Sequence, residues 1–447
     1  MKRVLILAYY FPPIAASGSM RPVGFCNHLM ENGYYPHVLT TDWRDAHPPV
    51  AIDPSLENLI PDGVRIDRLS HVNLLKELLE LRSRFRSKVH GGGHGDSPEV
   101  PVDATPPSPI KRLKRDMMNR LFLFPDHQKP WIHAVNRHVK GLGRQERPDL
   151  VFATGNPWSA LIAGQQVARY LSVPFVADFR DPWSQNPKPP LSDSLGRKAV
   201  VWERKILKDA DCVVANTREL ADAFAQEVPE SSNKIVTITN GYHDGIFPDG
   251  RIAEQSRVAD AKIELSHFGS VYELRSPIKL LQAIQQLWKA GVVTKEDIRV
   301  RFIGAWIVED VACNRLAAEL ETAGLITREP PVAHDAYLNR LAAAQNLLIL
   351  QQAFPLQIPG KIYEYIASGR PMIIVGGEGA TANLVARHRL GLTFPNSIDQ
   401  LAEGLRDLVE GKITVSCPGN DEIHRFSYGE LTRQLAGVFD HLLLEKT

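Results

Sequence analysis

Short apolar runs alternate with amphipathic stretches along most of this chain. Residues 3–9 form a continuous apolar run, which is typical of a strand buried on both faces. A helical pattern over 22–32 ends at Gly33, and a second apolar run, HVLTT, follows it. Strand, glycine-containing loop, helix and strand in this order predict the opening βαβ unit of a doubly wound parallel sheet.

The same alternation resumes after a polar, turn-rich segment at 242–261. A length of 447 residues is typical of two domains. We therefore expect an α/β fold of two Rossmann-like, doubly wound domains that face each other across a cleft. The first domain covers 1–241, 242–261 is the linker, and the second domain covers 262–424. The end of the chain, 425–447, predicts an amphipathic helix that packs back on the first domain.

Composition excludes several classes of protein. The formal net charge is +1 and 44% of the residues are hydrophobic, so nothing indicates a nucleic-acid partner. The four cysteines are scattered without a CxxC pair, which favours a reducing compartment and no cysteine metal site. No window approaches the roughly 18 apolar residues of a membrane span. We expect a cytoplasmic protein.

A basic insertion at about 82–120 interrupts the first domain. Two stretches rich in lysine and arginine flank a linker rich in glycine and proline, HGGGHGDSPEVPVDATPPSP, which cannot bury a core. Basic amphipathic segments suit an anionic membrane surface, and this would place the protein at the inner face of the cell membrane. A solvated helix face explains the same charges. His90 and His94 fit a solvated loop better than a metal site.

Polar side chains follow the strands of the first half. The run VPFVADF is followed by Arg180 and Asp181, and it contains Asp178 close to its end. Ligands of open α/β sheets bind outside the carboxyl ends of the strands, so these residues are candidates for the site. An Asp–Arg pair that ties down a loop is the alternative. Gly18 follows the first strand. It is either an ordinary turn glycine, or a position where the backbone lies close to a phosphate or to an acceptor substrate.

The most informative stretch of the second half is 358–375, IPGKIYEYIASGRPMIIV. It predicts a Pro-Gly turn, a short helix, a break and a buried strand. Gly360 permits close backbone approach to an anionic group, and Lys361 supplies a positive charge. Glu364 accepts hydrogen bonds when ionised, which suits the hydroxyl pair of a ribose.

A second loop of this half carries related chemistry. The strand LSHF runs into Gly269, and Arg275 follows in the loop. Together with Lys361, Arg275 is a cation of the type that neutralises a diphosphate. No DxD-like or histidine-rich cluster accompanies these residues. We therefore expect no metal and no cofactor, and a leaving group stabilised by protein charges and dipoles.

Five motifs together resemble the retaining family-4 glycosyltransferases of the GT-B fold, in the variant common among bacterial polysaccharide enzymes. They are LILAYYFPPIAASGSMRP, VADFRDPWS, ITNGYHDGIF, LSHFGSVYELRSP and IPGKIYEYIASGRPMI. The resemblance implies transfer of a sugar from a nucleotide-diphosphate donor, by default a UDP-sugar, to a glycan or lipid-linked acceptor. It implies retention at the anomeric carbon, no metal, and a role in cell-surface polysaccharide biosynthesis.

The resemblance also implies roles for individual residues. The glutamate at Glu364 binds the ribose of the nucleotide. Gly18 lies near the donor diphosphate, and Gly269 and Arg275 grip the same group. Asp178 and Asp181 resemble the acidic strand-end group that faces acceptor and sugar, and they are the candidate catalytic residues.

Two alternatives remain open at the level of sequence. A nucleotide-sugar epimerase of the same two-domain fold needs no acceptor. A degenerate member would bind without catalysis, and two departures from the family pattern motivate this hypothesis. Ser270 stands where an arginine usually follows the glycine, and Leu356 stands where the longer signature has a second glutamate.

Overall fold

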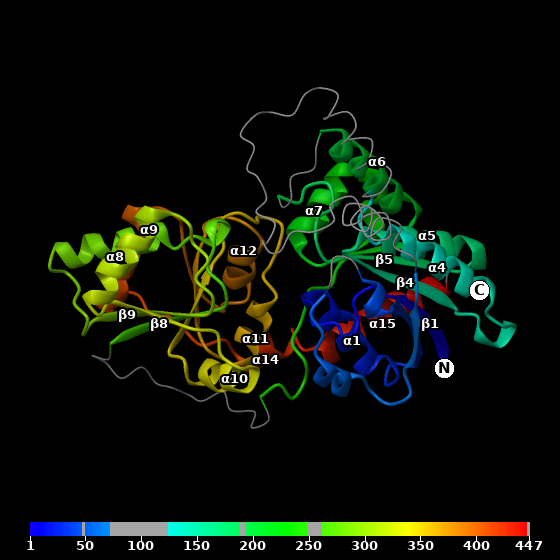
Figure 1. Cartoon of the computed structure of the whole chain (residues 1–447), viewed down its shortest axis with the longest axis horizontal. Helices are drawn as coiled ribbons and strands as arrows, with labels where there is room; N and C mark the ends of the chain where they lie inside the picture. Colours follow the sequence, from blue (N-terminus) through cyan, green and yellow to red (C-terminus); the bar gives the residue numbers. More distant parts are fainter. Residues whose placement is uncertain (47–49, 72–123, 188–192, 248–261, 445–447) are drawn as a thin grey trace, which may run out of the picture. The chain divides into compact units, whose positions relative to one another are not determined.

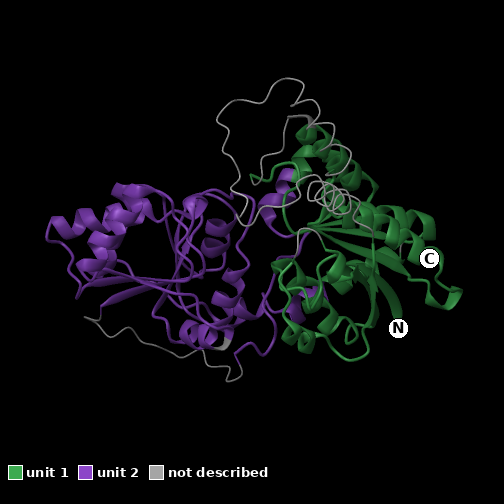
Figure 2. Cartoon of the chain, viewed as in Figure 1, with its two compact units in different colours: residues 1–215, 224–236, 435–447 green, residues 216–223, 237–434 purple. Residues whose placement is uncertain are grey.

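The computed structural model describes residues 1–46, 50–71, 124–187, 193–247 and 262–444 (Figure 1). The whole of the expected insertion at 82–120 lies outside the described residues. The chain divides into two compact units (Figure 2). Unit 1 comprises residues 1–215, 224–236 and 435–447, and unit 2 comprises residues 216–223 and 237–434. Each unit contains one sheet flanked by helices, which confirms the prediction of two doubly wound α/β domains.

Unit 1 is built on a seven-stranded sheet with the order β3-β2-β1-β4-β5-β6-β7. Its strands are β1 (Lys2–Leu7), β2 (Tyr34–Thr41), β3 (Arg65–Leu69), β4 (Leu150–Gly155), β5 (Phe175–Phe179), β6 (Cys212–Ala215) and β7 (Ile235–Thr237). Its helices are α1 (Ser17–Leu29), α4 (Lys129–Lys140), α5 (Trp158–Leu171), α6 (Asp193–Asp209) and part of α7 (Arg218–Glu227). The chain builds outward from β1 in one direction and from β4 in the other. The switch point of this sheet is therefore at β1 and β4.

Unit 2 is built on a six-stranded sheet with the order β10-β9-β8-β11-β12-β13. Its strands are β8 (Ile263–Phe268), β9 (Ile298–Ile303), β10 (Ile326–Glu329), β11 (Asn346–Leu350), β12 (Met372–Val375) and β13 (Gly391–Phe394). Its helices are α8 (Ile278–Lys289), α9 (Val311–Thr322), α10 (His334–Ala343), α11 (Lys361–Ala367), α12 (Ala380–Arg387), α13 (Ile398–Val409) and α14 (Asn420–His424). All its pairings are parallel, and the switch point is at β8 and β11.

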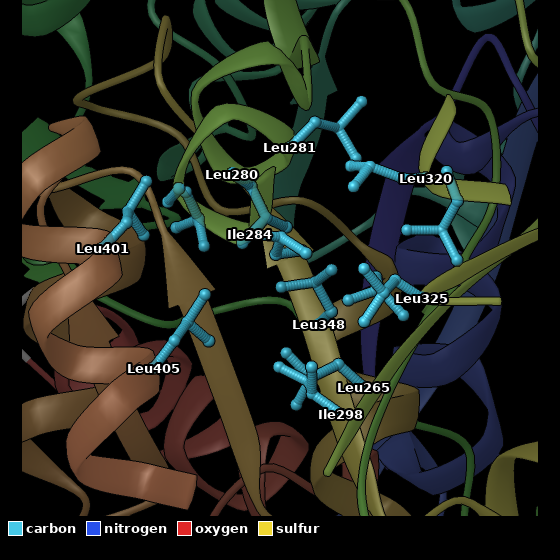
Figure 3. Close-up of a cluster of buried hydrophobic side chains, with 14 of the residues drawn as sticks. Leu265, Leu280, Leu281, Ile284, Ile298, Leu320, Leu325, Leu348, Leu401 and Leu405 are labelled. Carbon is cyan, nitrogen blue, oxygen red and sulfur yellow. The ribbon is translucent and has the colours of Figure 1, made fainter. Parts of the chain in front are cut away.

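The sheet of unit 2 is buried on both faces, because successive side chains of a strand point to opposite sides. Leu348 packs in a cluster with residues of α8, α9 and α13, such as Leu280, Leu320 and Leu405 (Figure 3). Leu347, its neighbour in sequence, lies in the other cluster, to which α10, α11, α12 and α14 contribute. This alternation explains why the core strands read as continuous apolar runs.

The last helix, α15 (Tyr428–Leu444), contributes to both units, since the division falls after Gln434. Within unit 1, Asp440 accepts hydrogen bonds from Tyr34 Oη at 2.7 Å and from Lys2 Nζ at 2.9 Å. Phe439 packs edge-on against the rings of Tyr34 and Phe152. The end of the chain thus packs on β1, β2 and β4. None of the described helices is long and apolar enough to cross a membrane.

Two local predictions from sequence differ from the structure. Helix α1 begins at Ser17, so Gly18 lies in its first turn and not in a preceding loop. The sequence suggests a start at Pro22, since proline favours the first turn, but here the helix contains it at its sixth residue. Strand β10 is not predicted. It is a four-residue edge strand, and its Thr-Arg-Glu sequence carries no apolar signal.

Candidate functional site

The strands β8 and β11 of unit 2 end side by side at the switch point of their sheet. The loop after β8 begins at Gly269, whose φ of +112° is in the left-handed region that favours glycine. Gly304, at the end of β9, has a φ of +149°, and a side chain there would overlap the carbonyl oxygen of Gly269. Glycine is therefore required by the backbone conformation at Gly269, and by the close approach of the two loops at Gly304.

Lys361, the first residue of α11, reaches across to the end of β8. Its Nζ donates to the carbonyl oxygen of Phe268 at 2.8 Å and lies 3.2 Å from Nε2 of His267. Nδ1 of His267 lies 3.0 Å from the carbonyl oxygen of Leu348 on β11. Because a carbonyl only accepts, Nδ1 carries the proton, and Nε2 offers its lone pair to Lys361. His267 thus fixes the ammonium group at the switch point.

A second cation, Arg275, lies in the same loop system. Its guanidinium stacks over the rings of Tyr272 and Phe354, at 5.6 and 5.9 Å from the ring centroids. Its Nε is buried and has no hydrogen-bond partner within the part of the chain that the structure describes. Burial, and secondarily the charge of Arg275, hold the pKa of Lys361 well below its usual value.

No carboxylate of the described residues forms an ion pair with Lys361 or Arg275. A partly buried pair of like charges without an acidic partner is electrostatically unfavourable, and a bound anion would relieve it. The switch point of unit 2 therefore has the charge and the orphaned donor of an anion site. The sequence predicts Gly269, Arg275 and Lys361 at one site, and the structure brings the three together.

Glu364 lies one turn further along α11 and is partly buried. Its carboxylate accepts a hydrogen bond from the hydroxyl of Tyr337 on α10. Tyr337 in turn packs against Phe268 at the end of β8, with ring centroids 5.5 Å apart. Burial raises the pKa of Glu364, while the Tyr337 hydroxyl opposes the shift. The carboxylate is therefore held in place beside the β8 loop.

Gly360, the residue before α11, is exposed, and a side chain there would meet nothing within 4 Å. Its φ of −54° is open to any residue. The described residues thus give no internal packing reason for glycine at this position, and open space lies above its Cα.

The switch point of unit 1 holds a buried ion pair. Nη2 of Arg21 lies 2.7 Å from Oδ1 of Asp178, and its Nε lies 3.0 Å from Oδ2. Thr154 donates to the same carboxylate at 2.6 Å. Asp178 is fully buried and Arg21 is 1% exposed. This is the Asp–Arg alternative of the sequence analysis, with Arg21 as partner. The geometry gives Asp178 a structural role and does not support contact with a substrate.

Gly18 and Arg180 lie next to this pair. The Arg180 guanidinium donates to the carbonyl oxygens of Gly18, Asn156 and Gly155, and its burial lowers its pKa. A side chain at Gly18 would lie 2.5 Å from Nη1 of Arg180. Asp181 is partly exposed and interacts electrostatically with Arg180. Of the two aspartates predicted to be catalytic, Asp181 alone has a side chain that solvent reaches.

Sequence reasoning missed three residues of these two centres. Arg21 stands in SGSMRP, in the loop that precedes the predicted helix, where nothing in the local sequence marks it as buried. His267 lies inside an apolar strand, and Tyr337 inside an amphipathic helix. Each is defined by a partner that is far away in the sequence, so no local pattern could reveal it. The histidine directly before the Phe-Gly turn is the one signal that could have been used.

A family model described as "Glycosyl transferase 4-like domain" matches residues 26–241. This part of the chain is therefore similar to a glycosyl transferase 4-like domain. It contains Asp178, Arg180 and Asp181, and it ends close to the polar segment that sequence analysis took as a linker.

Curated proteins that part of this chain resembles are glycosyltransferases. A D-inositol 3-phosphate glycosyltransferase from Streptomyces avermitilis is 28% identical over 208 residues, which cover 42% of this chain. The matched region spans less than half of that relative's length, 44%.

Solved structures show the same two-domain fold. A lipopolysaccharide outer core galactosyltransferase, WaaB, covers 100% of this chain and is itself covered to 100%, with a TM-score of 0.55 and 12% identity. The alignment with HepE from Anabaena, in complex with UDP and glucose, covers 100% of this chain and 98% of HepE. Its TM-score is 0.53 and the sequences are 14% identical. The alignment with a UDP-GlcNAc 2-epimerase from Methanocaldococcus jannaschii covers 99% of this chain and 100% of the epimerase. Its TM-score is 0.51 and the sequences are 14% identical. At these identities the likeness establishes the fold alone, which is the GT-B fold.

Proposed function

We propose that this protein is a glycosyltransferase that moves a sugar from a nucleotide-diphosphate donor to an acceptor. The observation that carries the proposal is the pair of cations at the switch point of unit 2. Lys361 and Arg275 converge beside the Gly269 loop without a carboxylate partner among the described residues. A diphosphate supplies the negative charge that this arrangement lacks.

The two cations also suit the chemistry of transfer. Lys361 directs two of its three ammonium protons to Phe268 and His267, which leaves the third for a ligand. Negative charge builds up on the diphosphate as its bond to the sugar breaks. Positive groups fixed in advance stabilise that charge without reorganisation, which lowers the barrier. On this proposal the departing group needs no metal ion.

The proposal assigns nucleoside recognition to Glu364. Its carboxylate, held by Tyr337, lies on the same helix as Lys361 and can accept from ribose hydroxyls. We take UDP as the nucleotide, because the solved HepE structure of the same fold contains UDP and glucose.

The finer features rest on the sequence motifs. Retention at the anomeric carbon, and a role in cell-surface polysaccharide biosynthesis, follow from the resemblance to family-4 enzymes. A lipid-linked acceptor at the cytoplasmic face of the membrane is supported by the basic residues of 82–120. Asp181 is the residue of the predicted acidic pair that we propose to face the acceptor.

Calorimetric titration of the full chain with UDP tests the donor site. Saturable binding at one site per chain, weakened in Lys361→Gln, is expected. Absence of UDP binding would favour a non-catalytic protein. A screen of UDP-sugars with membrane extracts as acceptor then tests transfer, by mass spectrometry of the products and nuclear magnetic resonance of the new linkage.

The epimerase of the same fold provides the alternative outcome. An epimerase converts the UDP-sugar in the absence of any acceptor and releases a changed sugar. A transferase releases UDP in proportion to the acceptor added. Conversion without acceptor would therefore overturn the proposed transfer while leaving the donor site intact.

A further inference from the structure

A cluster of ligand-type side chains lies on the sheet of unit 1, away from the switch point of that sheet. His37 is on β2, Asp67 is on β3, and His138 is in the last turn of α4. The register pairs Leu39 with Asp67, so His37, two residues earlier on the same strand, points to the same face as Asp67. Helix α4 packs on β3 and brings His138 onto that face.

The three side chains converge on one point. His37 Nε2 lies 2.7 Å and His138 Nε2 lies 3.2 Å from Oδ2 of Asp67. All three ligand atoms lie within 4.8 Å of one another, and within the described residues this is the one such group of three. Nε2 of His138 is buried, yet it has no hydrogen bond of acceptable geometry to any described residue. Hydrogen bonding within the cluster therefore leaves one imidazole nitrogen unsatisfied.

We propose that His37, Asp67 and His138 bind a divalent transition-metal ion of the zinc type. Imidazole and carboxylate are the ligands that such ions take, and three protein ligands leave a fourth position for water. At metal–ligand distances of about 2.0–2.2 Å, tetrahedral ligand atoms lie about 3.3 Å apart. The His138–Asp67 separation already fits this value. The His37–Asp67 pair has to open by about half an ångström.

The surroundings of the cluster provide an access route. His37 lines a cavity of about 470 Å³ at the start of β1, β2 and β3. Arg65, whose guanidinium lies 3.3 Å from Oδ2 of Asp67, has a closer partner in Glu146 at 2.7 Å. The ion can therefore replace Arg65 on Asp67 without leaving that arginine unpaired.

The role of this ion is structural, because it would link α4 to the edge strand β3 and to its neighbour β2. It is independent of the donor site in unit 2, where sequence analysis expects no metal. The sequence gives no motif for it, since the ligands are 30 and 71 residues apart along the chain.

Titration of the full, tag-free chain with Co²⁺ after removal of metals with a chelator tests the proposal. We expect one saturable equivalent with visible absorption bands of a tetrahedral site, displaced by Zn²⁺ and not by Mg²⁺. The variant His138→Gln should weaken Co²⁺ binding on the order of 10- to 100-fold or more, since it removes a direct ligand. His133→Gln, an exposed histidine on the same helix, is the matched control and should bind like wild type.

Co²⁺ binding without saturation, or equal loss in His138→Gln and His133→Gln, would overturn the site. Asp67→Asn provides a second ligand variant, and circular dichroism identifies any variant that fails to fold. Lys361→Gln should keep Co²⁺ binding while losing UDP binding, so failure of the metal site and failure of the donor site are distinguishable.

Discussion

The guanidinium of Arg180 donates a hydrogen bond to the carbonyl oxygen of Gly18, the atom that Pro22 leaves without a helical partner. In a regular helix the N–H of residue 22 would bond to this carbonyl, but proline has no N–H. Arg180 follows β5, whereas Gly18 is in the first turn of α1. The bond therefore ties the helix after β1 to the end of another strand, and it accounts for both the glycine and the proline of SGSMRP.

Replacing Gly18 by alanine should destabilise unit 1. The new Cβ would lie 2.5 Å from Nη1 and 2.9 Å from Nη2 of a buried arginine, so α1 or Arg180 has to shift. We expect a loss of about 1–3 kcal/mol in the free energy of unfolding, measured with urea. Gly437→Ala is the control, because this exposed glycine of α15 has nothing within 4 Å and alanine should stabilise it by about 0.5–1 kcal/mol. A stable Gly18→Ala variant with weakened UDP binding would instead indicate a ligand role.

The Arg21–Asp178 pair predicts a large, reversible loss of stability. Arg21→Met leaves the fully buried carboxylate with Thr154 as its partner, which should cost about 3–5 kcal/mol of unfolding free energy. The double variant Arg21→Met with Asp178→Leu should regain most of that loss, since neither charge of the pair is then left buried without its partner. Urea unfolding of the four proteins in the cycle measures this. If Asp178 were catalytic, the Asp178→Asn variant would instead have normal stability and no turnover.

How much the sequence predicts depends on how local the determining contacts are. The loops at Gly269 and Lys361 were predictable, because they follow apolar strands and carry glycine and cations within a few residues. The role of Asp178 was not, because its partner Arg21 is 157 residues away and no local pattern links the two side chains. The predicted start of α1 was wrong, because Pro22 resembles a proline in the first turn of a helix. Only the contact between Arg180 and Gly18 shows why the helix tolerates Pro22 at its sixth residue. Long-range pairing decides each of these cases.

Lys361 should make UDP binding depend on pH. The pKa of this buried ammonium is well below its usual 10.5 in the free protein, and a diphosphate favours the protonated form. As pH rises through that lowered pKa, binding must take up a proton, and affinity should fall by up to about tenfold per pH unit. Calorimetry from pH 6 upward in buffers of different ionisation enthalpy measures both effects. Lys361→Gln should weaken binding by about 10- to 100-fold and remove the pH dependence, whereas the exposed Lys279→Gln should change neither.

His267 should act through Lys361 by fixing its position. His267→Phe removes the acceptor at 3.2 Å from Nζ and leaves the carbonyl of Leu348 without its donor. We expect UDP to bind about tenfold more weakly, with a shifted pH profile, because the ammonium loses one of its two anchors. His267→Gln can donate with its amide nitrogen and accept with its oxygen, so it should restore part of the affinity. Equal binding by both variants would show that His267 is a packing residue only.

Glu364 and Tyr337 together test nucleoside recognition. Glu364→Ala should raise the donor KM and weaken UDP binding by about 10- to 100-fold, since ribose hydroxyls lose a charged acceptor. Tyr337→Phe should have a smaller effect of a few-fold, because the carboxylate remains but loses the hydroxyl that holds it. The distinguishing measurement is binding of inorganic diphosphate, which lacks the ribose. Both variants should bind it like wild type, whereas Lys361→Gln should not. If Glu364→Ala lost diphosphate and UDP equally, the carboxylate would be maintaining the shape of the β8 loop through Tyr337 and Phe268, and it would not be reading the nucleoside.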